Sequence, residues 1–416
     1  KREVKRLKNF FKMLSYICSI ISMMIFYVIG YESVSAQSSF TVSGDKSQIS
    51  LPYPLCVSTD VDSFILASTK NDCTKVGSGE LKLFNSIPIK KVDIKISDEK
   101  TVIPCGTPFG VKLYTRGVVV INMEDIVVNG KYLNPAKDAG LQVGDIILSA
   151  DGTETDTNEQ LSEIVSKSKG KSIKLKVRRD NVIFTTKLLP ALCGTAQYKI
   201  GVWVRDSSAG IGTMTFYDND TGCFAGLGHG ICDSEAGTIL PLLSGDIVTA
   251  EINGLTKSTT GSAGSLRGYF ADDNAIGTIL TNSERGVFGK AEKAPIDNLE
   301  IPIAWKQNVH TGEAKVLSTI DGSEPKYYNI WIENVSRNDN QETKNMVIHV
   351  TDGELLDTAG GIVQGMSGSP IIQDGKLIGA VTHVFVNDPT RGYAIFAENM
   401  YESVNEIAQN SIENIA

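Results

Sequence analysis

The apolar residues near the start of the chain form one unbroken run. Residues 13–31 carry no charge and are almost entirely apolar, and at 1.5 Å per residue a helix of this length can just cross a hydrocarbon core of about 30 Å. Residues 1–12 are basic, with a local excess of +5 against −13 for the rest of the chain. This pattern predicts a cytoplasmic tail and a transmembrane signal-anchor, with the remainder exported. Val34-Ser35-Ala36 has the small-x-small form of a signal-peptidase site, so removal of the segment stays an alternative to anchoring.

After this segment, apolar residues alternate with polar ones as they do in β-strands. Residues 32–45 contain mainly Ser, Gly and Gln and are interpreted as a linker. Val92, Ile94 and Ile96 alternate with charged residues, which is the period of a strand buried on one face. We interpret residues 32–105 as the linker followed by a small β-rich region that packs and has no chemistry of its own.

A helical period interrupts the strand-like pattern after Thr157. Thr157 and Gln160 match a capping box, in which each side chain bonds the backbone amide of the other residue. Leu161, Ile164 and Val165 then recur at the spacing of one helix face. Short alternating runs on both sides of this helix predict strands.

The stretch before the helix contains a series of tight turns. Residues 134–148 read NPAKDAGLQVGDIIL, in which Gly140 ends a short helix and Gly144-Asp145 turns into a strand. This order resembles a PDZ domain of the bacterial protease-associated type, and we assign residues 106–192 to it.

The PDZ resemblance implies a peptide-binding groove. Such a groove takes an extended peptide, often a C-terminus, as an extra strand beside a sheet edge. The resemblance assigns the receiving edge and loop to Gly110, Val111, Lys112 and Leu113, and the opposite wall to the helix bearing Leu161 and Val165. A packing domain that binds no peptide is the alternative.

Ser367 lies in the sharpest motif of the chain, Gly365-Met366-Ser367-Gly368-Ser369-Pro370. A serine hydroxyl is a poor nucleophile unless a base takes its proton and donors stabilise the oxyanion. The flanking glycines let the backbone fold tightly, so that amide groups converge on one point. The motif resembles the nucleophile loop of chymotrypsin-like proteases, which implies that the amides of Gly365 and Ser367 bind the oxyanion. A Gly/Ser turn between strands is the alternative.

His229 is the best candidate for the base among the four histidines. It lies between two glycines in residues 226–231, which suits a side chain held in a loop at a cleft. It also precedes Ser367, which is the order of chymotrypsin-like enzymes. His383 lies within an apolar strand pattern and is interpreted as structural.

Spacing does not decide which carboxylate would orient His229. Chain order leaves two aspartates close to Ser367 and others further away. The candidates are Asp233, Asp272, Asp273, Asp352, Asp357 and Asp388.

Three segments together resemble the stage IV sporulation protein B peptidase family of endospore-forming bacteria. They are residues 226–231, 360–373 and 379–389, and the preceding PDZ-like unit fits the same family. The resemblance covers nearly the whole exported chain. It implies a serine peptidase domain over residues 193–416, built as a trypsin-like double β-barrel, in agreement with the Gly-rich, strand-like pattern there.

The same resemblance implies the roles of the site residues and the biology. His229, Asp352 and Ser367 match the family's triad. The family is exported across the forespore inner membrane into the intermembrane space. There it cleaves a membrane-bound regulator of an intramembrane metalloprotease, which activates a late sigma factor, and it also cleaves itself near the N-terminus.

A non-catalytic PDZ scaffold of the spore envelope, with a pseudo-peptidase barrel, is the rival interpretation. The net charge of −8 argues against a nucleic-acid partner. We expect no metal or organic cofactor, because HExxH and Gly-rich phosphate motifs are missing.

Overall fold

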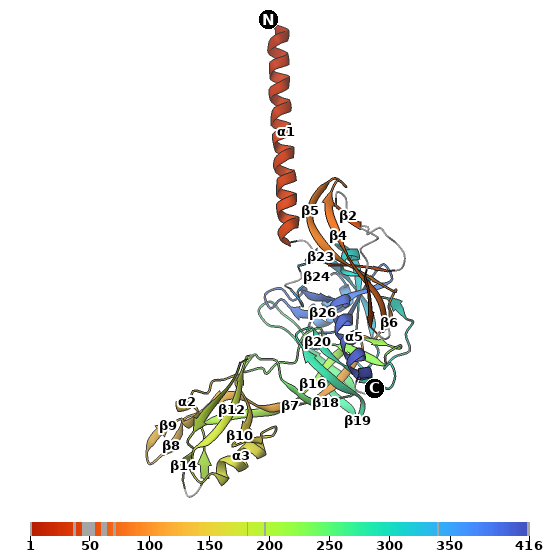
Figure 1. Ribbon diagram of the computed structural model, residues 1–416. Helices are drawn as coiled ribbons and strands as arrows, with labels where there is room; N and C mark the ends of the chain where they lie inside the picture. Colours follow the sequence, from red (N-terminus) through yellow and green to blue (C-terminus); the bar gives the residue numbers. More distant parts are fainter. Residues whose placement is uncertain are drawn as a thin grey trace. The chain divides into compact units, whose positions relative to one another are not determined.

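The computed structural model comprises two compact units (Figure 1). The first consists of Lys1–Lys100, Ile303–His310 and Val335–Gln341, and the second of Thr101–Pro302, Thr311–Asn334 and Glu342–Ala416. The structure describes residues 2–35, 39–43, 55–59, 65–69, 72–180, 182–194, 197–338 and 341–413.

The first unit begins with the long helix α1 (Arg2–Ser35), whose Lys8–Tyr27 stretch is long and apolar enough to cross a membrane. Its only other helical element in the described residues is the short 3-10 turn η2 (Lys306–Asn308). Ala36 of the possible signal-peptidase site, and part of the 32–45 linker, lie outside the described residues.

A five-stranded sheet completes the first unit, and its core contains Phe40, Leu81, Val92 and Ile94. Val92 and Ile94 are buried and Lys91 and Asp93 are exposed, which confirms the predicted alternation there, whereas Lys95 and Ile96 are both half-buried. The strands are β1 (Ser39–Ser43), β2 (Leu55–Thr59), β3 (Ile65–Thr69), β4 (Asp72–Leu83) and β5 (Ile87–Ser97).

The second unit contains two six-stranded barrels, so the predicted mainly β, double-barrel class is confirmed. The first barrel is closed by pairing between β7 and β16. Around it run β7 (Pro108–Met123), β18 (Leu242–Thr256), β19 (Ser265–Ser283), β20 (Gly286–Ala291), β17 (Cys223–Gly226) and β16 (Val202–Asp218). Its interior is filled by side chains such as Phe109, Phe224 and Val287.

The second barrel is followed by a C-terminal helix that contacts strands of both barrels. Its strands are β22 (Gly312–Ser318), β23 (Lys326–Val335), β24 (Met346–Val350), β27 (Arg391–Phe396), β26 (Lys376–Val384) and β25 (Pro370–Gln373). The helices are α4 (Gly353–Ala359) before the nucleophile loop and α5 (Ala397–Glu413) at the end.

The PDZ unit follows the predicted pattern closely. The capping box of Thr157 and Gln160 is present and starts α3 (Asn158–Lys167), which buries Leu161 and Val165. The unit's elements are α2 (Pro135–Asp138), α3, β8 (Ile126–Val128), β9 (Lys131–Leu133), β10 (Ile146–Ala150), β11 (Thr153–Glu154), β12 (Ile173–Arg179), β13 (Val182–Leu188), β14 (Ala191–Cys193) and β15 (Gln197–Lys199). Two short strands, β6 (Thr101–Pro104) and β21 (Ile301–Pro302), extend the sheet of the first barrel.

The barrel and the PDZ unit share two long strands. The first half of β7 pairs with β18 in the barrel, whereas its second half pairs with β10 in the PDZ unit. β16 runs antiparallel to β7 from Val202 in the PDZ unit into the barrel, where Thr213 lies opposite Pro108. The PDZ unit is therefore inserted into the first barrel. This barrel includes the first half of β7, which the sequence analysis assigned to the PDZ domain and not to the peptidase domain that it began at residue 193.

This arrangement corrects the predicted peptide-binding edge. Residues 110–113 have β16 on one side and β18 on the other, so no edge is free there for a peptide. A Cβ on Gly110 would lie 2.6 Å from the side chains of Phe270 and Val248. The glycine is required by packing inside the barrel and not by a bound peptide.

In the PDZ unit, an ion pair joins the turn before β10 to the end of β12. The carboxylate of Asp145 is 1% exposed and accepts from Arg179 at 2.7 and 2.8 Å. Arg179 also donates to the carbonyl of Gly140, the residue that ends the α2 turn. Because a buried carboxylate is costly unless it is paired, Arg179 supports the turn that precedes β10.

We expect Arg179→Ala to destabilise the PDZ unit by about 2–3 kcal/mol, since it leaves Asp145 buried with only a backbone donor from Gln142. Lys167→Ala is the matched control, because the Lys167–Glu163 pair is exposed and should contribute less than about 0.5 kcal/mol. Urea titration measures the destabilisation in both variants, with amide exchange in β12 as the probe of unfolding. Equal effects would show that the Arg179 pair acts as an ordinary surface pair.

Candidate active site

The Ser367 loop is fastened to the first barrel by two threonines of β16. Thr213 Oγ1 donates to the carbonyl of Gly365 at 2.8 Å, and Thr215 Oγ1 donates to that of Gly368 at 2.7 Å. A Cβ on Gly368 would overlap the carbonyl oxygen of Thr213. Gly365 and Gly368 also have φ of +101° and +95°, which favour glycine. The loop therefore needs both glycines to fold against β16.

Some backbone amides of the Ser367 loop donate to a carbonyl group, and others have no acceptor among the described residues. Met366, Gly368 and Ser369 donate to the carbonyls of Val363, Val381 and Met366, respectively. In the described part of the chain, the amides of Gly365 and Ser367 have no acceptor. Two free amides beside a serine hydroxyl are what an oxyanion hole requires.

The His229 loop is shaped by left-handed residues and by one asparagine. Leu227 and Gly228 have φ of +68° and +67°, which turn the chain sharply before His229. Asn282 accepts from the Ile231 amide at 2.8 Å and donates to the carbonyls of Ile231 and Leu240 at 3.0 and 2.9 Å. Sequence reasoning missed Asn282, because it lies in no motif and acts across some fifty residues.

His229 and Ser367 line one cleft of about 600 Å³. The Ser367 hydroxyl donates to the carbonyl of Thr382 at 2.7 Å, and Nδ1 of His229 lies 2.9 Å from the carbonyl oxygen of Gly230. A proton on Nδ1 would be donated to Gly230, which leaves Nε2 free to accept. Proton transfer then requires the hydroxyl to turn from Thr382 towards the imidazole, as happens when catalytic hydrogen bonds tighten on substrate binding.

The structure places Asp352 away from this cleft. Its carboxylate caps α4 by accepting from the Leu355 amide at 3.2 Å, and it also accepts from the Asn329 amide at 3.1 Å. In the described residues it makes no hydrogen bond with His229, whose ring bonds only to Gly230. The predicted triad is therefore not assembled in this structure.

The other candidate aspartates also have partners outside the cleft. Asp233 is buried and pairs with Arg205 at 2.7 Å. Asp388 accepts from Thr390 at 2.6 Å, and Asp272 accepts from Asn274. Asp357 likewise does not line the cleft, and the side chain of Asp273 lies outside the described part of the structure.

His383 also lines the cleft, which its interpretation as a structural residue did not anticipate. It lines the same cavity as Ser367, and its ring centroid is 5.1 Å from that of His229, with the rings tilted by 39°. Its strand pattern is apolar because the neighbouring residues fill the barrel core. The sequence therefore contained no signal that this one side chain faces the other way.

Both imidazoles favour the neutral form. Burial lowers the pKa of His229 below its ordinary value, against the opposing effect of the hydrogen bond with Gly230. Desolvation of the ring in the cleft, followed by the charges of His229 and Lys344, lowers the pKa of His383 to about 4, although the residue as a whole is exposed. A neutral histidine beside a serine can act as a general base at pH 7.

Two known families match the sequence. The sequence model of the family SpoIVB peptidase S55 matches residues 196–401, and that of the PDZ domain matches residues 106–189. The chain belongs to the SpoIVB peptidase family.

Two solved structures resemble parts of this SpoIVB peptidase. The PDZ domain of the SdrC-like protein from Listeria monocytogenes is 19% identical, covers 21% of this chain and 87% of its own, and has a TM-score of 0.18. The Rv3671c protease in its inactive form is 14% identical, covers 47% of this chain and 84% of its own, and has a TM-score of 0.29. The family assignment rests on the sequence matches alone.

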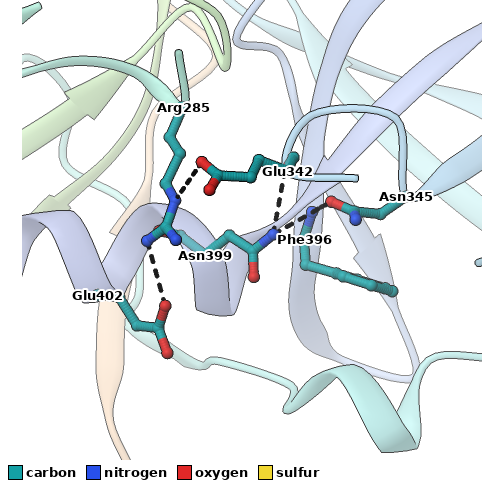
Figure 2. Close-up of polar contacts among 6 residues, drawn as sticks. All are labelled: Arg285, Glu342, Asn345, Phe396, Asn399 and Glu402. Atoms are coloured by element: carbon teal, nitrogen blue, oxygen red, sulfur yellow. Dashed lines mark hydrogen bonds and ion pairs between the residues drawn. The ribbon is translucent and has the colours of Figure 1, made fainter. Parts of the chain in front are cut away.

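In this SpoIVB peptidase the β19–β20 turn ties the two barrels together (Figure 2). Arg285, three residues after Asn282, donates to Glu342 at 3.0 Å and to Glu402 of α5 at 3.2 Å. Asn399 of α5 donates to the carbonyl of Glu342 at 3.1 Å. One turn thus holds the His229 loop through Asn282 and the second barrel through Arg285.

We expect Asn282→Ala to lower kcat about 10- to 100-fold, because small misplacements of a catalytic base are costly. Asn274→Ala, on the same strand, should leave kcat unchanged, because Asn274 is exposed and, among the described residues, bonds only Asp272. Turnover of a peptide substrate measures both variants. Unchanged turnover in Asn282→Ala would show that the His229 loop keeps its shape without this side chain.

The lowered pKa of His229 has a direct consequence for the pH profile. The neutral base is the active form, so the acid limb of kcat/KM should have an apparent midpoint below 6.5, the ordinary histidine value. The same protonation favours the unfolded state, so the fold should lose stability as the pH falls through 6.5. A midpoint above 6.5 would instead indicate a carboxylate near the ring.

Proposed function

We propose that this SpoIVB peptidase is a serine endopeptidase in which Ser367 is the nucleophile and His229 the general base. Ser367 Oγ forms a bond to the scissile carbonyl carbon while its proton passes to His229, which then delivers the proton to the leaving amine. The amides of Gly365 and Ser367 receive the negative charge on the oxygen. The observation that carries this proposal is that two free amides, Ser367 and His229 all belong to one cleft.

The substrate class follows from the domains and the family. PDZ and peptidase domains bind proteins or peptides, and the family resemblance points to a membrane-bound regulator of an intramembrane metalloprotease. Cleavage there would activate a late sigma factor during sporulation. α1 supports a location at a membrane. The family resemblance points to the forespore intermembrane space, where the protein would also cleave its own N-terminal region.

The rival is a non-catalytic scaffold with a pseudo-peptidase barrel. The intact His229 and Ser367 motifs and the free amides favour an enzyme over this rival. The left-handed glycines do not separate the two interpretations, because packing against β16 requires them in either case.

We expect a fluorophosphonate probe to label the protein at Ser367 and to leave Ser367→Ala unlabelled. Purified protein should also shorten with time at its N-terminal region, whereas Ser367→Ala should keep its length. Ser369→Ala is the matched control, since Ser369 is buried and bonds Ser318 outside the cleft. Absence of labelling in the unmodified chain would support the scaffold.

The family resemblance and the structure give Asp352 two different roles, as the aspartate of the triad and as the cap of α4. A triad aspartate replaced by asparagine typically loses about 10⁴ in turnover, as measured for chymotrypsin-like enzymes. A helix cap replaced by asparagine loses almost nothing, because asparagine caps as well as aspartate. We expect Asp352→Asn to turn over peptide within a few-fold of the unmodified chain, like Asp357→Asn. A loss of several orders of magnitude confined to Asp352→Asn would restore it to the triad.

A further inference from the structure

The peptide group between Gln364 and Gly365 is held by the first barrel. The carbonyl of Gln364 accepts from the amide of Leu266 at 2.8 Å, and the amide of Gln364 donates to the carbonyl of Gly264 at 2.8 Å. Both partners lie at the start of β19, where Gln364 forms a parallel bridge with Ser265. The nucleophile loop therefore begins after a residue whose two backbone groups are both bonded.

This contact also fixes the direction of one oxyanion amide. A peptide group is planar and trans, so the Gln364 carbonyl and the Gly365 N–H point in opposite directions within one plane. While Leu266 holds that carbonyl, the Gly365 N–H points away from β19, and it has no acceptor among the described residues. Rotation of the peptide group would break the Leu266 bond. It would also turn the Gly365 N–H towards β19 and out of the cleft that Gly365 lines.

Ser258 joins this contact to the chain that leads into the Ser367 loop. The residue is 3% exposed, and it lies in the connection between β18 and β19. Its hydroxyl donates to the carbonyl of Ile362 at 2.9 Å and accepts from the amide of Gly264 at 2.7 Å. Its own amide donates to the carbonyl of Ala359 at 2.8 Å. One serine thus ties Gly264, which bonds Gln364, to residues that precede the nucleophile.

We propose that Ser258 is a positioning residue of the oxyanion hole. It acts through Gly264 and Gln364 to keep the Gly365 N–H directed into the cleft, where this donor binds the negative oxygen that forms when Ser367 attacks. Ser258 itself does not line the cleft, and no proton moves through it. The proposal rests on the proposed function.

Ser258→Ala leaves the Ile362 carbonyl and the Gly264 amide without this partner. We expect kcat to fall about 10- to 100-fold with KM nearly unchanged, because loss of a whole oxyanion donor costs about 10²–10³ in kcat. A peptide aldehyde forms a hemiacetal with Ser367, whose oxygen binds at the oxyanion amides, so its inhibition constant should rise by the same factor. The peptide alcohol of the same sequence has no such oxygen, and its inhibition constant should stay unchanged.

Ser262→Ala is the matched control and should leave kcat and both inhibition constants unchanged. Ser262 is an exposed serine of the same connection, and among the described residues only its backbone forms hydrogen bonds, both with Thr259. Ser258→Thr keeps the hydroxyl and should recover most of the kcat. If thermal unfolding shows that Ser258→Ala does not fold, Ser258→Cys replaces it, since a thiol keeps the volume and is a weaker hydrogen-bonding group.

Full kcat in the folded variant would overturn the proposal. A loss of kcat with an unchanged aldehyde inhibition constant would also overturn it, because the oxyanion amides would then be intact. Absence of fluorophosphonate labelling at Ser367 in the unmodified chain would instead overturn the proposed function.

A second inference concerns the substrate and stands on the lining of the cleft. In the described part of the chain, no lysine, arginine or carboxylate lines it, and its two histidines favour the neutral form. Many of the lining residues are apolar, among them Ile211, Leu227, Val384 and Val386. An ionised substrate side chain would lose water in this cleft without meeting an opposite charge.

Apolar residues lie next to the place where the residue before the scissile bond must bind. Its carbonyl oxygen has to reach the amides of Gly365 and Ser367. Residues 362–363 lead into that loop, and Val384 follows Thr382, whose carbonyl holds the Ser367 hydroxyl. All of them line the cleft, so they are available to the side chain of that substrate residue.

Val386 lies where the cleft opens to solvent. It is 51% exposed, and its carbonyl accepts from the amide of Gly261 at 2.9 Å, which holds this part of the chain against the first barrel. A substrate that covers Val386 removes its side chain from water, which favours binding of apolar groups. We infer that the peptidase prefers an uncharged, apolar residue immediately before the scissile bond, and that Val386 contributes to this preference. This inference also rests on the proposed function.

Three quenched peptides test the preference. Each carries a single leucine, aspartate or lysine in an otherwise identical Ala–Gly sequence, and mass spectrometry locates the cut. Cleavage should follow the leucine, with kcat/KM about 100-fold above that of the other two peptides. Val386→Asp should raise the ratio of kcat/KM for the lysine peptide to that for the leucine peptide about 10-fold. Val182→Asp, at an exposed position on β13, is the matched control and should leave the ratio unchanged.

Equal cleavage of the three peptides would overturn this inference, as would an unchanged ratio in Val386→Asp that still labels with fluorophosphonate. Cleavage of none of them by a chain that labels at Ser367 would overturn it as well. Cleavage of the leucine peptide by Ser367→Ala would instead overturn the proposed function.

Discussion

The close approach of two backbones at Gly368 is the contact on which the catalytic site depends. A Cβ at this position would overlap the Thr213 carbonyl and lie 2.5 Å from the Leu227 amide nitrogen. Thr213 belongs to β16 and Leu227 starts the His229 loop, so one glycine brings both the strand and the loop against the nucleophile. Two threonine hydroxyls then hold the Ser367 loop in place.

The contact at Gly368 also connects the site to the PDZ unit, because β16 pairs with β7 in both the first barrel and the PDZ unit. This pairing has register shifts at Trp203/Val204 and Arg205/Ser207 between the two parts. A flexible linker between two domains would let them move independently, whereas shared strands transmit displacement from one to the other. The Arg205–Asp233 ion pair joins β16 to the turn that follows His229.

The electrostatics of the cleft differ from those of a carboxylate-assisted site. Burial favours the neutral form of His229 and His383, and in the described residues no negative side chain lines the cleft to oppose it. Such a site keeps its base unprotonated at lower pH but stabilises the imidazolium less during the reaction.

The sequence by itself determined the elements whose signals are local. The capping box at Thr157, the alternation around Val92 and the glycines beside Ser367 depend only on neighbours a few residues away, so pattern and turn chemistry predict them. Only the tertiary structure decided that Gly110 lies inside a barrel, that Asp352 caps a helix and that His383 enters the cleft. The positions of Gly110 and His383 depend on the register of strands far apart in the chain, and one bulge at Thr382 is enough to reverse the side to which a residue points. The Asp352 cap is a local contact, and only the tertiary structure shows that it lies outside the cleft.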